Sequence, residues 1–294
     1  MLEEDGVVGT ELSATHFIMT DTDKIIERIY KGFEQENASD VRLSRLGSSY
    51  IGSECLRQVY YKWRAFDVSK FTGRTLRIFE TGSTQEQRVL SDLKKANFIV
   101  HDEELSGEQY PVQYSKTDST GHFITKIDGV VEGIDGDPRP HLLEIKTLNQ
   151  RNYNALCKHG VKKHKPVHWE QIQSSLFLFK LEIALYVGLN KNTEEFFIEA
   201  IEADPDFPKV FNEKINRLVN ATLVPVGISD NPEYFECKWC DYSEVCFHEK
   251  DPLVHCRTCT NSRPIKDGEW QCNLTKDILS MEAQKKGCDE HDPF

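Results

Sequence analysis

Two short stretches decide how this chain can fold: Ile127-Asp128-Gly129-Val130 and Leu142-Leu143-Glu144-Ile145-Lys146. Each reads as an apolar strand that carries charged residues. Side chains alternate between the two faces of a strand, so Glu144 and Lys146 should point the same way, with Ile145 buried between them. If the two strands are neighbours, Asp128 can meet Glu144 at one point, with Lys146 beside them.

This set of groups suits phosphodiester hydrolysis. Mg²⁺ or Mn²⁺ prefers oxygen ligands, which Asp128, Glu144 and the backbone carbonyl of Ile145 would supply. Such an ion makes a bound water more acidic and offsets charge on the phosphoryl oxygens, while Lys146 would orient the water and stabilise the transition state. A Glu-x-Lys pair also occurs in ordinary hairpins, so the motif needs support from the rest of the chain.

The remaining elements predict a central mixed sheet flanked by helices, an α/β fold. Apolar periodicity predicts helices over 21–35, 54–66, 76–96, 167–179 and 207–219, and strands over 110–114, 122–132, 141–147, 184–189 and 195–200. We expect an N-terminal helical segment (1–40), a core (41–250) and a cysteine-rich module (251–294). The absence of a long apolar run or a signal-peptide pattern predicts a cytoplasmic protein without membrane partners, in the host cytoplasm if the chain is viral.

A net charge of −12 is unusual for a protein that binds DNA. One stretch that contains no Asp or Glu softens this objection: Arg151, Lys158, Lys162, Lys163 and Lys165, with three histidines. This stretch follows the Glu144/Lys146 strand directly and could contact phosphates. The alternative is a solvated loop.

In order and spacing, these motifs resemble the PD-(D/E)xK nuclease superfamily, in particular its RecB-like and phage exonuclease members. The resemblance implies a restriction-endonuclease-like core in which Glu86 is a further metal ligand and Gln171 or Gln173 lies near the substrate. The chain departs from the family pattern because it has no His shortly before Glu86 and no Tyr four residues after Gln171 or Gln173.

Four of the nine cysteines resemble the iron–sulfur ligands of some RecB-like nucleases, with one distant cysteine and a triad: Cys55, Cys237, Cys240 and Cys246. The resemblance implies a 4Fe–4S cluster that closes the fold. Zinc, which also accepts four thiolates, is the alternative occupant.

A second set of cysteines is spaced by 2, 12 and 15 residues: Cys256, Cys259, Cys272 and Cys288. This spacing predicts a small zinc module, in which His291 or His255 could replace one ligand. Cys157 belongs to neither set, and we expect it to pack against a helix.

The sequence therefore favours a metal-dependent DNA nuclease that acts in recombination, repair or phage DNA processing. An exonuclease is favoured over an endonuclease. DNA is the expected partner, and a recombination or replication protein is a further one. Three alternatives stay open: a structure-specific endonuclease, a DNA-end or single-strand binding protein that keeps the fold without cleaving, and an interaction protein with purely structural metal sites.

Overall fold

A computed structural model describes residues 22–37, 43–68, 71–105 and 111–294 of the chain. Its centre is a five-stranded sheet in the order β10-β9-β8-β7-β2. The strands are β2 (Ile99–His101), β7 (Gly129–Glu132), β8 (His141–Leu148), β9 (Ile183–Asn190) and β10 (Phe196–Glu202). Only β8 and β9 are parallel, and the sheet is therefore mixed, as the sequence predicts.

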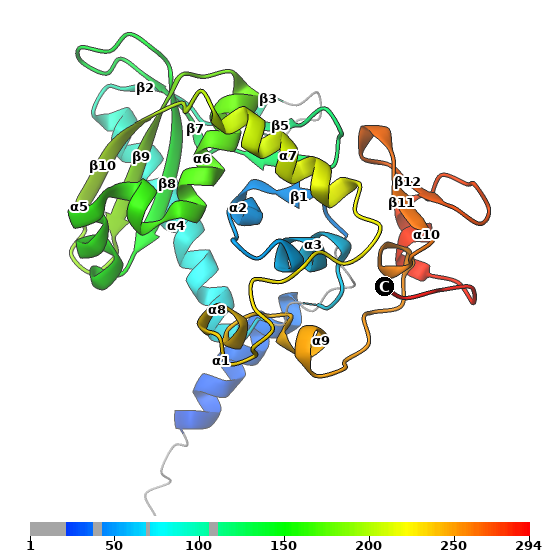
Figure 1. Cartoon of the computed structure of the whole chain (residues 1–294). Helices are drawn as coiled ribbons and strands as arrows, with labels where there is room; N and C mark the ends of the chain where they lie inside the picture. Colours follow the sequence, from blue (N-terminus) through cyan, green and yellow to red (C-terminus); the bar gives the residue numbers. More distant parts are fainter. Residues whose placement is uncertain (1–21, 38–42, 69–70, 106–110) are drawn as a thin grey trace, which may run out of the picture.

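Helices cover both faces of this sheet (Figure 1). On one face, α4 (Gly73–Lys95) packs Val89 and Leu90 against Leu143 and Ile145 of β8. On the other face lie α5 (Gln150–His164) and α6 (Pro166–Phe179), which together form the crossover between the parallel strands β8 and β9. Because residues of β8 alternate between faces, both helical layers are anchored on the strand that carries Glu144.

The predicted strand over 122–132 is in fact two strands in two sheets. Phe123–Lys126 forms β6, which pairs with β1 (Leu46–Gly47) and β5 (Ser115–Thr117) in a three-stranded sheet, and β7 begins only at Gly129. Gly129 has a φ of +157°, and a Cβ there would lie 2.7 Å from the His101 carbonyl oxygen. Asp128 therefore lies where the chain crosses from one sheet to the other.

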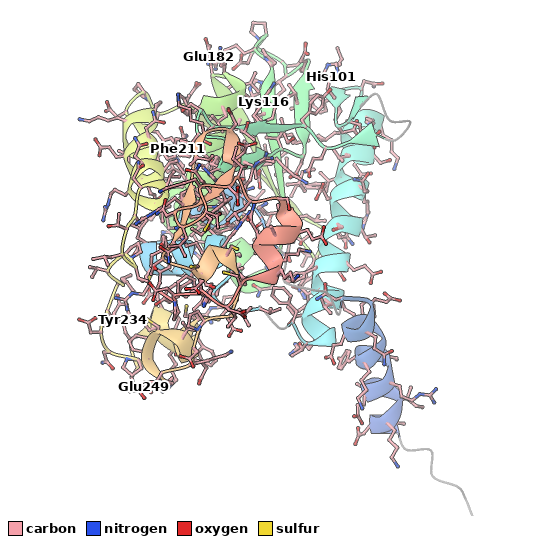
Figure 2. The ribbon with its side chains drawn as sticks, turned by 90° about the vertical axis from the view of Figure 1, so that its right-hand side faces the viewer. His101, Lys116, Glu182, Phe211, Tyr234 and Glu249 are labelled. Carbon is pink, nitrogen blue, oxygen red and sulfur yellow. The ribbon has the colours of Figure 1, made fainter. Side chains whose placement is uncertain are left out.

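A second apolar core lies beneath the smaller sheet. It is built from α2 (Ser48–Ile51), α3 (Leu56–Arg64) and α7 (Phe207–Val219), and Phe211 of α7 packs edge-on against Phe123 of β6. His101, at the end of β2, and Glu182, just before β9, lie at the opposite end of the molecule from Tyr234 and Glu249 (Figure 2). The segment between Tyr234 and Glu249, which carries Cys237, Cys240 and Cys246, therefore lies at the opposite end from these strand ends.

The remaining elements are short or peripheral. The helix α1 (Thr22–Asn37) contacts α4 through its C-terminal half and projects from the body (Figure 2). The C-terminal elements are α8 (Phe235–Lys238), α9 (Ser243–Phe247), the 3₁₀ turn η1 (Cys256–Thr258), β11 (Ser262–Pro264), β12 (Trp270–Cys272) and α10 (Met281–Lys286). Of these, α8, α9, η1 and β12 contain cysteines. Two further strands, β3 (Glu104–Leu105) and β4 (Pro111–Val112), replace the predicted strand over 110–114, whose first residue lies outside the described residues. None of the helices in the described ranges is long and apolar enough to cross a membrane.

Candidate active site

Asp128, Glu144 and Lys146 lie together at the edge between β7 and β8. The register pairs Gly129 with Leu143, which brings the preceding Asp128 opposite Glu144. Oδ2 of Asp128 accepts a hydrogen bond from the Ile145 backbone N–H at 2.7 Å. Lys146 forms an ion pair with Oε1 of Glu144. The alternation along β8 puts Glu144 and Lys146 on one face, and the register between β7 and β8 brings Asp128 opposite Glu144.

The Glu144 carboxylate is almost fully buried, with 1% of its side chain exposed. Its Oε1 also accepts a hydrogen bond from Nε2 of Gln171 on α6, at 2.7 Å, whereas its Oε2 has no partner among the described residues. Burial raises the pKa of Glu144 to about 7, although the Lys146 charge opposes this shift. An unpartnered, buried carboxylate oxygen is costly unless another group satisfies it.

The other two carboxylates share this environment. Burial, and then the charge of Asp128, raise the pKa of Glu86 on α4 to about 7. Burial also raises the pKa of Asp128. For Lys146, burial opposes the charged form, but the charges of Glu144 and Asp128 outweigh it and raise the pKa. A hard divalent cation would offset this repulsion between carboxylates, although Glu86, Asp128 and Glu144 do not converge on one point among the described residues.

Gln171 and Gln173 have different surroundings. Gln173 points away from the site: it donates to the Glu202 carbonyl oxygen at 2.9 Å and accepts from the Asp204 backbone N–H at 2.8 Å. Of the two glutamines that the sequence offers, the structure brings only Gln171 to Glu144.

A cavity of about 460 Å³ opens beside Lys146 and Gln171. Its other lining residues are Ser49, His164, Lys165, Pro166, Val167 and His168. Burial, followed by the charges of Lys146 and Lys165, lowers the pKa of His168 to about 3, so this imidazole is neutral. Of the five Arg and Lys residues predicted to contact phosphates, only Lys165 lines this cavity.

The other four basic residues lie on the helix α5, so the alternative in which this stretch is a solvated loop is wrong. Lys162 forms a 3.6 Å ion pair with Asp204 and lies over the ring of Trp169, whereas Arg151, Lys158 and Lys163 are exposed. Cys157 is exposed on the same helix, so the expectation that it packs against a helix is wrong. The helix bends at Gly160, where φ is +72° and the following N–H of Val161 donates to Glu199.

The cysteines of the first set gather around a second cavity of about 410 Å³, lined by Cys55, Cys237, Cys240 and Cys246. Two of their sulfurs accept hydrogen bonds from α3: Cys246 from Nη1 of Arg57 at 3.1 Å, and Cys240 from Nε2 of Gln58 at 3.5 Å. Donors of this kind stabilise thiolate ligands. Across the described residues, however, no three His, Cys, Asp or Glu side chains converge tightly enough to form a ready-made metal shell.

Two residues that contribute to the site belong to none of the sequence motifs. Gln113 donates to Oδ1 of Asp128 at 3.1 Å, and Ser49 lines the cavity from α2. Gln113 lies in the predicted strand over 110–114 and Ser49 in none of the predicted elements, and neither belongs to a motif, so no sequence signal singles them out.

Comparisons with known proteins give the following results. No family model matches the chain, and no curated protein is similar to it. The alkaline exonuclease LHK-Exo from Laribacter hongkongensis, in complex with dAMP, is 15% identical over 65% of this chain and 90% of its own, with a TM-score of 0.44. A solved structure of SSO0001 is 18% identical over 78% of this chain and 98% of its own, with a TM-score of 0.41.

Proposed function

We propose that this chain is a DNA nuclease that depends on Mg²⁺ or Mn²⁺ and has a PD-(D/E)xK core. The observation that carries the proposal is the buried Glu144, whose free Oε2 lies in a cluster of mutually destabilised carboxylates, with Lys146 and Gln171 on its other oxygen. An ordinary structural ion pair would not need the charges of Glu86 and Asp128 so close by.

Glu86, Asp128 and Glu144, with the Ile145 carbonyl, would hold the metal. When bound, the ion supplies a more acidic water and offsets charge on the phosphate. Lys146 would orient that water and stabilise the negative charge that develops on the phosphoryl oxygens. Gln171 fixes one oxygen of Glu144 and leaves the other for the metal, a positioning role.

The neighbouring cavity would take the DNA backbone. Lys165 places a positive charge there beside the Ser49 hydroxyl and two histidines. The exposed Arg151, Lys158 and Lys163, together with Lys162, would add contacts to more distant phosphates. This arrangement gives DNA a local basic approach despite the net charge of −12. An exonuclease is the form we favour, because the sequence motifs resemble those of phage exonucleases, and we place its activity in recombination, repair or phage DNA processing.

We further propose that Cys55, Cys237, Cys240 and Cys246 bind a 4Fe–4S cluster, with zinc as the alternative. The mainly apolar cavity and the donors on Arg57 and Gln58 support a thiolate-bound group at this position. Such a group would join the start of α3 to the short helices α8 and α9. Brown protein that absorbs near 400 nm after anaerobic purification would support the cluster.

The test is cleavage of end-labelled single- and double-stranded DNA by anaerobically purified protein with Mg²⁺ or Mn²⁺. Asp128→Asn and Lys146→Ala should abolish the products, whereas Glu132→Gln on the same strand as Gly129 should not, because Glu132 faces His101 outside the site. The released label gives the polarity, and an internal cut in a circular substrate would indicate an endonuclease. DNA binding without cleavage in the wild type would favour the binding protein.

A further inference from the structure

The helix α6 meets the sheet at two neighbouring points. His168 and Gln171 are three residues apart, so both lie on one face of this helix, which packs on β8 and β9. Glu144 and Tyr186 are partners in the register of these two parallel strands. Gln171 donates to Glu144 at 2.7 Å, and the Tyr186 hydroxyl lies 3.0 Å from Nδ1 of His168. The same face of α6 therefore contacts the carboxylate site through Gln171 and the adjacent tyrosine through His168.

The bond between Tyr186 and His168 has a favoured direction. Tyr186 is fully buried, with 0% exposure, and Nδ1 of His168 is its hydrogen-bond partner among the described residues. A phenol keeps its proton near neutral pH, and a buried O–H group that does not donate is costly. Tyr186 therefore donates to Nδ1, and the proton of a neutral His168 ring resides on Nε2.

The surroundings of His168 disfavour its charged form. Two ammonium groups line the same cavity, those of Lys146 and Lys165, and the described lining contains no Asp or Glu. The low pKa of His168, which burial chiefly causes, agrees with this lining. The imidazole is therefore an uncharged group in a basic cavity.

Nε2 of His168 is accessible to a ligand. It has no partner in the part of the chain that the structure describes, and it is not among the described side-chain nitrogens that are both buried and unpartnered. Because His168 lines the cavity of about 460 Å³ and bonds to Tyr186 through Nδ1, a molecule in the cavity can reach the ring through Nε2. Such a molecule would also meet Lys165 and the Ser49 hydroxyl, and a lining rich in donors fits an anion.

We propose that Tyr186 holds His168 in its Nε2–H form, and that this N–H group donates to a phosphate oxygen of DNA in the cavity. The identity of the ligand rests on the proposed nuclease function, whereas the position of the ring proton rests on the contact with Tyr186. His168 supplies a directed hydrogen bond without an ion pair, in contrast to Lys165. Tyr186 is a positioning residue, because it acts on the DNA only through His168.

The first test measures the position of the ring proton by nitrogen NMR on full-length wild type with isotope-labelled histidine, in the absence of DNA. His168→Gln identifies the resonances of His168 among those of the ten histidines. We expect a neutral ring protonated at Nε2. Tyr186→Phe should shift the ring toward a mixture of both tautomers, whereas the control Tyr153→Phe, whose hydroxyl bonds to the Phe196 carbonyl oxygen, should not. A wild-type ring protonated at Nδ1, or an unchanged ring in Tyr186→Phe, would overturn the proposal.

The second test measures binding of a fluorescein-labelled oligonucleotide by anisotropy, without divalent metal so that it is not cleaved. Gln places an amide near the position of Nε2, whereas the shorter Asn places it near that of Nδ1. We expect His168→Asn to weaken binding about tenfold and His168→Gln by less than about threefold, the loss and retention of one hydrogen bond to a charged group. Both should keep the wild-type slope of log affinity against log salt, because no ion pair is lost.

The results separate this contact from the nuclease function. Equal losses in His168→Asn and His168→Gln, or a changed salt slope in His168→Asn, would refute the hydrogen bond even if the wild type cleaves DNA. The expected affinities in a wild type that never cleaves would support the contact and overturn the nuclease. If His168→Asn does not fold, labelled wild type decides: the oligonucleotide should shift the Nε2 resonance of His168, and an unchanged resonance would refute the contact.

Discussion

The carboxylate site and the C-terminal segment both concentrate buried charge, but different forces hold them in place. Glu144 is carried by β8 of the five-stranded sheet and Asp128 directly precedes β7, and the backbone ladder between β7 and β8 sets their spacing. The C-terminal segment has strands of only three residues, and its contact with α3 depends on Arg64, Arg257 and the aromatic rings around them. A sheet can therefore tolerate changes in the charged groups that it displays, whereas the C-terminal segment depends on them for its own structure.

The largest expected effect is on catalysis. Glu144→Gln should lower kcat by about 10³-fold, because the free carboxylate oxygen proposed to bind the metal is lost. The free energy of unfolding should fall by less than the about 3–5 kcal/mol that removing one partner of a buried ion pair costs, because Asp128 still offsets the charge of Lys146. Cleavage assays and urea denaturation measure the two effects, with Glu132→Gln as the control. An unfolded Glu144→Gln protein would contradict the comparison.

The opposite pattern is expected at the C-terminal contact. Arg64→Met should lower the free energy of unfolding by about 2–4 kcal/mol, because the carbonyl oxygens of Arg257 and Ser262 lose their donor. The kcat of the folded protein should stay within about threefold of wild type, since this contact lies outside the carboxylate site. Urea denaturation measures the free energy of unfolding, and a cleavage assay on the same sample measures kcat. A large loss of kcat with unchanged stability would reverse the assignment.

The two glutamines of α6 provide a matched pair within one helix. Gln171→Ala should reduce kcat by about 10–100-fold with little loss of stability, because it positions Glu144. Gln173→Ala should leave kcat unchanged and lower the free energy of unfolding by about 1–2 kcal/mol, because it bonds to Glu202 and Asp204. Equal effects of the two substitutions on kcat would remove the distinction.

His168 adds a pH dependence to the sheet region. Its pKa in the folded protein is lowered to about 3, chiefly by burial, so the unfolded chain binds an extra proton below its ordinary pKa of about 6.5. This histidine therefore lowers stability progressively as the pH falls from about 6.5 toward 3. His168→Gln should make the free energy of unfolding depend less on pH between those values. An unchanged pH profile in denaturation experiments would show that His168 protonates freely in the folded state.

The smallest effect is expected at the rim of the cavity. Lys165→Ala should weaken DNA binding several-fold and reduce the slope of log affinity against log salt by about one, the loss of one phosphate contact. Lys209→Ala, exposed on α7, is the control with no expected change. Fluorescence anisotropy at several salt concentrations measures both slopes. A normal slope for Lys165→Ala would exclude a phosphate contact there.

The sequence predicts the sheet region well because its apolar alternation and the register of its strands follow from local periods. The predicted strands over 184–189 and 195–200 fall within β9 and largely within β10, and the period of two places Glu144 and Lys146 on one face. The helix α5 was not predicted. It buries only Leu156 and Val161, is broken by Gly160, and relies on Glu199 of another element.

Tertiary pairing, which no local pattern encodes, explains the remaining differences. The alternation over 122–132 runs without interruption, so only the pairing partners reveal that two sheets divide it. For the same reason, Gln171 and Gln173 are equivalent in sequence, and the packing of α6 alone decides which of them meets Glu144. The role of Arg64 depends on residues almost two hundred positions away.

The turn between β7 and β8 offers a handle for physical experiments. A Cβ at Gly133 or Gly136 would meet no atom within 4 Å, so this turn faces open space. Asp128 and Glu144 lie at the other end of the β7–β8 pair, because Gly129 is opposite Leu143 and Val131 is opposite His141. Residues inserted between Asp135 and Gly136 leave that register unchanged. A fluorophore or surface tether attached there would leave the carboxylates free, which suits single-molecule recording of the proposed DNA cleavage.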